Sequence, residues 1–241
     1  MTSALRLALA SLLLLRCSLA AVLLAPHRAK RIKVACVGAS ITQGFRSSPG
    51  RDYPSVLGRL LGGRYEVRNF GRGGATAMLR GHKVKNQSYV NASYTCTQQY
   101  QDALDFLPDI VVTQFGANDA KDINWKKHGR EMVPDYRKLV ESFRNLTSHP
   151  TVYIMVPPPL YHDTAFNMSG KVLNDHVPYQ LYQLSDNIRA PSIDISRAFK
   201  KHCPLHKTHN CNWMSYDGCH PNDRGYRLIA KMVAAAIKAG I

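Results

Sequence analysis

The feature that most constrains the fold of this chain is a regular alternation of short apolar runs with longer amphipathic segments. The apolar runs are rich in Val and Ile and end at glycine, proline or polar residues, which is typical of buried β-strands. Strands that alternate with helices favour right-handed crossovers and a parallel sheet covered on both faces. We therefore expect an α/β fold: a three-layer α/β/α sandwich around a central, mainly parallel five-stranded sheet.

The expected elements occupy one domain. The chain has 241 residues, of which 45% are hydrophobic, and this is enough for one sizeable core. The expected strands are residues 32–37, 65–70, 110–115, 152–156 and 192–195. The expected helices are residues 53–61, 98–107, 134–146, 177–188 and 225–239.

The first 31 residues have no acidic side chain and are dominated by Leu and Ala. Arg16 interrupts the apolar run, so no stretch is long enough to span a bilayer. Small residues before position 20 fit signal cleavage near Ala20. We expect a secretory signal peptide at 1–20, a basic linker at 21–31 and the folded domain at 32–241; the alternative is an uncleaved N-terminal anchor.

Glycosylation sequons agree with export into the secretory-pathway lumen or out of the cell. Four Asn-x-Ser/Thr sequences occur, and none has proline in the middle position. The acceptor residues are Asn86, Asn91, Asn145 and Asn167.

The cysteines also fit an oxidising compartment. Cys17 would leave with the signal peptide, and Cys36 lies in the first expected strand as a buried free thiol. The other four can form two disulfides in three connectivities. The short span between Cys203 and Cys211 favours that pair, which leaves Cys96 with Cys219.

Zinc is the alternative role for the cysteines, because four histidines lie near the last three of them. The histidines are His202, His206, His209 and His220. Neither a CxxC pair nor an HExxH motif accompanies them, so we expect no metal.

The formal net charge is +16, or +14 once Arg6 and Arg16 leave with the signal peptide. The basic residues are scattered and form no nucleic-acid-binding motif. An anionic substrate, a glycan matrix or a membrane surface is therefore a better expected partner than nucleic acid. The oligomeric state stays open.

Four segments of unusual composition lie at strand ends or in loops. They are residues 38–40 (Gly-Ala-Ser), 69–76 (Asn-Phe-Gly-Arg-Gly-Gly-Ala-Thr), 116–119 (Gly-Ala-Asn-Asp) and 217–222 (Asp-Gly-Cys-His-Pro-Asn). Because the carboxyl ends of parallel strands meet at one edge of a sheet, the four can converge there.

Together these segments contain what acyl transfer requires. A serine is a weak nucleophile and needs an adjacent base, and a histidine base needs a carboxylate to fix its tautomer. Ser40, His220 and Asp217 can fill these roles, although Ser40 could instead be a simple helix N-cap. The backbone N–H groups of Ser40 and Gly74 and the Asn118 amide can supply an oxyanion hole.

These four segments resemble the conserved blocks of the SGNH hydrolases in the GDSL esterase superfamily. The stretches "GASITQG", "NFGRGGATA", "GAND" and "DGCHPN" match them, and the resemblance spans about residues 32–239. It implies a flavodoxin-like fold, the triad Ser40, Asp217 and His220, and no cofactor. Ala39 departs from the family, which usually has Asp there.

The subtype is similar to lysophospholipase-L1-like and sialate-O-acetylesterase-like members. This resemblance implies a secreted serine esterase for small-molecule or glycan esters, most simply acetyl esters of carbohydrate. A lysophospholipase or lipase-like esterase and a non-catalytic glycan-binding relative are the alternatives. Trp125, Tyr161, His162 and Phe166 follow strand ends and are candidate substrate contacts, unless they serve only in packing.

Overall fold

The structure is a computed structural model that describes residues 30–85, 88–206 and 210–240. At its centre is a five-stranded sheet in the order β2-β1-β5-β6-β7, in which every neighbouring pair is parallel. This confirms the expected α/β fold class. The strands are β1 (Ile32–Gly38), β2 (Tyr65–Gly71), β5 (Ile110–Gln114), β6 (Thr151–Val156) and β7 (Ser192–Asp194). The expected signal peptide and Asn86 lie outside the described residues.

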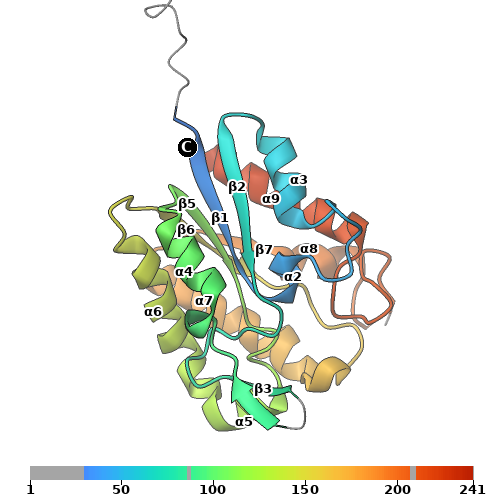
Figure 1. Cartoon of the computed structure of the whole chain (residues 1–241). Helices are drawn as coiled ribbons and strands as arrows, with labels where there is room; N and C mark the ends of the chain where they lie inside the picture. The colour runs from blue at the N-terminus through green and yellow to red at the C-terminus, as the bar shows by residue number, and fades with distance from the viewer. Residues whose placement is uncertain (1–29, 86–87, 207–209, 241) are drawn as a thin grey trace, which may run out of the picture. The chain divides into compact units, whose positions relative to one another are not determined.

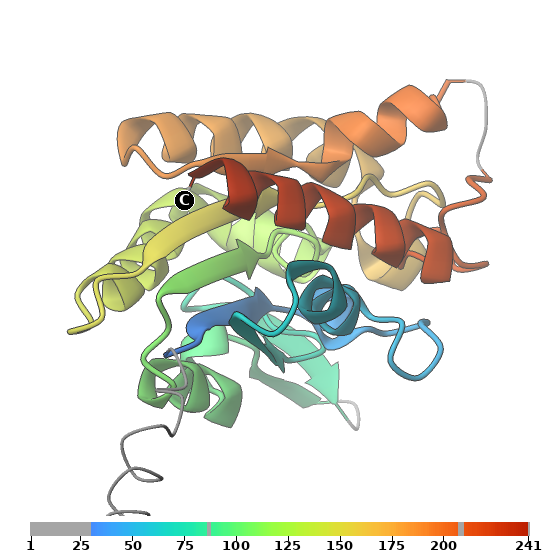
Figure 2. The same cartoon turned by 90° about the horizontal axis from the view of Figure 1, so that it is seen from above.

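Helices cover both faces of this sheet. One layer contains α3 (Tyr53–Leu61), α8 (Ile195–His202) and α9 (Asp223–Gly240). The other contains α4 (Gln98–Asp105), α6 (Met132–Arg144) and α7 (Val177–Asn187). Figure 1 shows α3 and α9 on one side of the strands and α4 and α6 on the other, and Figure 2 shows the layers from above.

Alternate residues of the central strands supply the two cores. In β1, Val34 and Cys36 pack with the layer of α3, α8 and α9, whereas Ala35 and Val37 pack with the opposite layer. Because both faces are buried, the strand sequence is a continuous apolar run rather than an alternating one. This is why the strands were recognisable in the sequence.

Several short elements were not expected. They are α2 (Ser40–Gln43), the antiparallel hairpin β3 (His82–Lys85) and β4 (Ser88–Asn91), α5 (Asp122–His128), the 3₁₀ turns η1 (Tyr94–Cys96), η2 (Gly129–Glu131) and η3 (Ala165–Asn167), and the π-helical turn η4 (Val172–His176). The helix α8 was also missed as a separate element. Most of these lie in the loops that surround the candidate site.

The strand order places a crevice between the carboxyl ends of β1 and β5. From β1 the chain crosses to β2 on one side, and from β2 it crosses back over β1 to reach β5. Connections that leave neighbouring strands in opposite directions open a ligand-binding crevice at this switch point. Among the described helices, none is both long and apolar enough to cross a membrane.

Candidate active site

Ser40 lies at the switch point, directly after β1. It is the first residue of the four-residue helix α2, and no side chain caps this helix. The Ser40 Oγ lies 2.9 Å from His220 Nε2. The serine therefore does not serve as a helix cap here, and its hydroxyl is directed to an imidazole that can accept its proton.

His220 and Asp217 share a tight turn just before α9. Asp217 Oδ2 lies 2.9 Å from His220 Nδ1, while Asp217 Oδ1 accepts hydrogen bonds from the backbone N–H groups of Cys219 and His220. Gly218 has a φ of +65°, and a Cβ at this position would lie 2.5 Å from the His162 ring. The turn thus requires glycine, and its own backbone holds the carboxylate against the imidazole.

The electrostatics of this pair favour a neutral histidine beside an ionised aspartate. Burial lowers the pKa of His220 below its ordinary value; Asp217 opposes this effect, and the charges of Arg46 and Lys121 add to it. Burial works to raise the pKa of Asp217, but the hydrogen bonds from the turn hold it well below its ordinary range. At neutral pH, His220 is therefore available as a base.

Three residues from different loops bring hydrogen-bond donors to the lining of one pocket: Ser40, Gly74 and Asn118. Within the described residues, the backbone N–H groups of Ser40 and Gly74 donate to no protein acceptor. Gly74 has a φ of +80°, which favours glycine at this position. The Asn118 side chain donates one N–H to the Ala75 carbonyl at 3.0 Å, which leaves its second N–H for another acceptor. The arrangement can stabilise a developing oxyanion.

These groups line one pocket of about 390 Å³. Two aromatic rings flank the imidazole of His220 at its mouth: Phe45 at 4.7 Å and Phe166 at 5.4 Å between ring centroids. Phe45 and Phe166 are 44% and 45% exposed, although large aromatic side chains usually lie in the core. The pocket thus combines a polar centre with an apolar rim, as small-molecule sites commonly do.

A comparison with protein families identifies the chain. The model of the GDSL-like lipase/acylhydrolase family matches residues 36–228, which include the whole sheet from the middle of β1 onward and all four loop segments. The chain belongs to this family. The resemblance seen in the sequence is confirmed.

One individual protein and several solved structures are also similar to this chain. An acetylxylan esterase of Xylanibacter ruminicola is 28% identical over 228 residues, covering 86% of this chain. The chain spans 43% of the length of that relative. Among solved structures, Est24, a carbohydrate acetylesterase from Sinorhizobium meliloti, has a TM-score of 0.66 at 20% identity and covers 88% of this chain and 100% of its own. The acetyl xylan esterase AlAXEase has a TM-score of 0.62 at 21% identity, covering 86% and 100%. These structures share the GDSL-family fold.

Sequence reasoning missed several side chains that hold the site loops together. Gln43 Oε1 accepts the Gly73 N–H at 2.9 Å and so fixes the loop that carries Gly74. The buried Asp119 carboxylate accepts the backbone N–H groups of Met78 and Gly116, and burial raises its pKa to about 6. Both residues lie inside stretches that the sequence had already singled out, Gln43 in "GASITQG" and Asp119 in "GAND", so their roles could have been suspected.

Asn124 and Ser215 were missed in the same way. Asn124 donates to the carbonyl groups of Asn118 and His82, which joins the Asn118 loop to the hairpin β3–β4. Ser215 donates its hydroxyl to Asp217 Oδ1 at 2.8 Å. No local sequence signal distinguishes these residues from ordinary loop positions.

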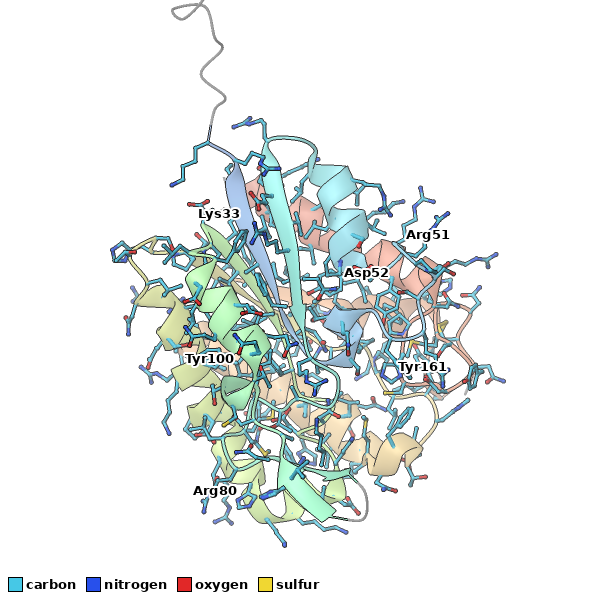
Figure 3. All side chains as sticks on the ribbon, in the orientation of Figure 1. Lys33, Arg51, Asp52, Arg80, Tyr100 and Tyr161 are labelled. Atoms are coloured by element: carbon cyan, nitrogen blue, oxygen red, sulfur yellow. A yellow bond between two sulfur atoms is a disulfide. The ribbon has the colours of Figure 1, made fainter. Side chains whose placement is uncertain are left out.

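The structure places three of the expected substrate contacts outside the pocket that Ser40 and His220 line. Tyr161, labelled in Figure 3, is 2% exposed and donates its hydroxyl to backbone carbonyls at Phe199 and Cys203. Trp125 packs near His176, and His162 packs against the catalytic turn. Each of the three rings packs against neighbouring elements instead of lining this pocket. Phe166, by contrast, does line it.

The disulfide expectation was half right. Cys203 and Cys211 are bonded, with their Cα atoms 5.5 Å apart. The expected bridge between Cys96 and Cys219 does not form, because Cys96 is exposed while the Cys219 thiol is buried against the sulfur of Met168 at 3.9 Å. Cys36 is a buried free cysteine, as expected.

The remaining expected features concern glycans and metals. Asn91, Asn145 and Asn167 are exposed, as glycan acceptors must be. Within the three described ranges, no group of three or more His, Cys, Asp or Glu side chains is placed to hold a metal ion.

Proposed function

We propose that this protein is a serine esterase that removes short acyl groups, above all acetyl, from carbohydrate. The observation that carries the proposal is the unbroken chain of contacts from Ser40 through His220 to Asp217, at 2.9 Å each. Ser40 and His220 line a pocket that Gly74 and Asn118 also line. A hydroxyl–imidazole–carboxylate series beside free hydrogen-bond donors is the arrangement that serine acyl transfer needs.

The proposed reaction proceeds in two steps. Ser40 Oγ attacks the ester carbonyl while His220 Nε2 takes its proton, and the tetrahedral oxyanion accepts hydrogen bonds from the N–H groups of Ser40, Gly74 and Asn118. His220 then returns the proton to the leaving alcohol as the acyl-enzyme forms. Water attacks the acyl-enzyme with His220 again as base, and the acid and free Ser40 result. Asp217 orients His220 throughout and stabilises its charged form.

The rim of the pocket supports a sugar as the alcohol part of the substrate. Phe45 and Phe166 present exposed ring faces beside His220, and Arg46 stacks on Phe45 and on the exposed Tyr216. Such a row of rings offers apolar faces and polar edges together, which suits the mixed surface of a sugar ring. A second pocket of about 650 Å³ shares the lining residue Met168 with the first and is a candidate site for further sugar units. The acetylxylan esterase and the carbohydrate acetylesterase among its relatives support the same reading.

Two alternatives make different predictions. A lysophospholipase or lipase-like esterase would use the same triad, and the exposed rings of Phe45 and Phe166 would then contact an acyl chain. A non-catalytic glycan-binding relative would not need the contact between Ser40 and His220. The geometry of the triad therefore favours an enzyme, and acyl length separates the two kinds of esterase.

We further propose that the protein acts in the secretory pathway or outside the cell as a glycoprotein. The signal-like residues 1–20, the sequons and the disulfide support this location. Cleavage of the N-terminal segment is tested by N-terminal sequencing of the protein secreted from a eukaryotic host. Retention of residues 1–20 in that product would favour the anchor instead.

The proposed activity is tested with a series of esters from acetyl to palmitoyl. We expect the highest kcat/KM for acetyl and a loss of several orders of magnitude in kcat for Ser40→Ala and His220→Ala. Ser142→Ala, on α6 and outside the catalytic pocket, is the matched control and should retain wild-type turnover. Wild-type turnover by purified Ser40→Ala would refute the nucleophile, and a preference for long-chain lysophospholipid would favour the lipase alternative.

A further inference from the structure

The catalytic pocket contains a charged side chain that the reaction does not use. Lys121 follows the Asn118 loop and lines the same pocket as Ser40 and His220. Within the described residues, its ammonium group makes no hydrogen bond and no ion pair. Other lysines do find partners; Lys126, for example, pairs with Asp122 at 2.7 Å.

The surroundings of Lys121 do not neutralise its charge. Burial lowers the pKa of Lys121, and the positive charge of Lys83 lowers it further. The nearby Cys219 thiol is no counter-ion, because burial raises its pKa to about 12 and keeps it protonated. The carboxylate of Asp217 is already held by His220 and by its own turn.

Two other cations lie next to residues of the same site. The side chain of Lys83 lies next to Gly74, where its Cδ would be 3.2 Å from an added Cβ. Arg46 contacts Asp217 at 3.3 Å, and its positive charge acts on His220. A half-buried ammonium without a counter-ion is costly, and the attraction between opposite charges is stronger in a partly desolvated pocket than in water.

We propose that Lys121 is a specificity-determining residue that binds a carboxylate of the substrate, so that the enzyme prefers acetyl esters of acidic sugars. This inference rests on the proposed function and names its substrate class. A sugar carboxylate would supply the counter-ion that Lys121 lacks. It would also hold the sugar while its acetyl carbonyl faces Ser40.

Lys121 could affect catalysis in a second way, through its charge on His220. That effect would change the turnover of every ester by the same factor, since it acts on the base and not on the substrate. Discrimination between an acidic and a neutral sugar is therefore the informative readout. The matched substrates are acetylated methyl glucuronide and acetylated methyl glucoside, which differ only at carbon 6.

The experiment measures acetate release and compares the ratio of kcat/KM for glucuronide to that for glucoside. For the wild type we expect a ratio above one, and for Lys121→Met a fall of about tenfold, the size of one charge-assisted contact. Lys121→Arg should retain most of the preference. Lys231→Met, on the exposed face of α9, removes the same net charge far from the pocket and should leave the ratio unchanged.

Each contrary outcome has a distinct meaning. An equal loss on both sugars in Lys121→Met would show that Lys121 acts only through His220, and an equal fall in Lys231→Met would show that overall charge sets the preference. Either result overturns the proposal. Binding is also measured without turnover, by NMR titration of Ser40→Ala with methyl glucuronide. If the Ser40→Ala, Lys121→Met double variant still binds methyl glucuronide as Ser40→Ala does, the proposal for Lys121 is overturned. If the wild type releases acetate from neither sugar, the proposed function is overturned, and the binding measurement still tests Lys121.

Discussion

Replacing Asn118 with alanine tests the oxyanion role most directly. Asn118 lines the pocket; its side-chain amide donates one N–H to the Ala75 carbonyl at 3.0 Å and has a second N–H without a protein acceptor among the described residues. Removal of one oxyanion donor costs roughly 10²–10³-fold in kcat, or about 2.7–4 kcal/mol. Loss of the bond to Ala75 costs about 0.5–1.5 kcal/mol of stability. Activity should therefore fall far more than stability.

The assay combines kcat for an acetyl ester with thermal unfolding. We expect a decrease in kcat of at least about 100-fold with KM nearly unchanged. The decrease in Tm should be a few degrees, because 1 kcal/mol corresponds to about 2–4 °C in a domain of this size. Asn174→Ala is the matched control: it also removes an asparagine that bonds to backbone, at Leu160, but lies outside the catalytic pocket. The donor role would be wrong if kcat of Asn118→Ala fell less than tenfold. It would also be wrong if the loss of activity equalled the fraction of protein that is unfolded at the assay temperature.

Two further predictions concern protons and thiols. Because burial and nearby positive charges lower the pKa of His220, the acid limb of kcat/KM should lie below about pH 6.5, the ordinary value for histidine. Arg46→Gln removes one of those charges and should move this limb to higher pH; a shift to lower pH in the rate profile would contradict the electrostatic argument. In native protein, iodoacetamide followed by peptide mass spectrometry should label the exposed Cys96 and spare Cys36 and Cys219, which burial protects and whose pKa values it raises to about 12. Rapid labelling of Cys219 would show that the catalytic turn opens.

The sheet could be predicted because its signal is local. Each central strand is buried on both faces and is therefore a run of apolar residues bounded by turn residues. Helix α3 was predicted with its observed limits, since Asp52 caps it through the Ser55 N–H and glycine follows at Gly62. Asp217 and His220 were recognisable because they lie three positions apart in one turn.

The short elements and the substrate contacts could not be predicted, because distant residues determine them. The hairpin β3–β4 has no continuous apolar pattern, and Asn124 holds it by bonding to both backbone groups of His82. Tyr161 follows a strand as a substrate contact would, but the carbonyls that bind its hydroxyl come from the region of α8. Likewise, the partner of Cys219 was inferred by elimination, and its thiol lies buried beside Met168 instead.

The hydrogen-bond donors that line the pocket without protein acceptors add to what the motifs indicate about function. Donors inside a fold are usually bonded, so several partly buried or buried donors without protein acceptors around one pocket are informative. In the described part of the chain, the backbone N–H groups of Ser40 and Gly74, the second side-chain N–H of Asn118 and the ammonium of Lys121 all lack protein acceptors, and all four residues line one pocket. Around them, side chains accept other loop donors: Gln43 accepts the Gly73 N–H, and the buried Asp119 accepts those of Met78 and Gly116. Such a fold holds four donors ready for one ligand that is rich in acceptors: three suit an oxyanion, and the charged one suits a carboxylate.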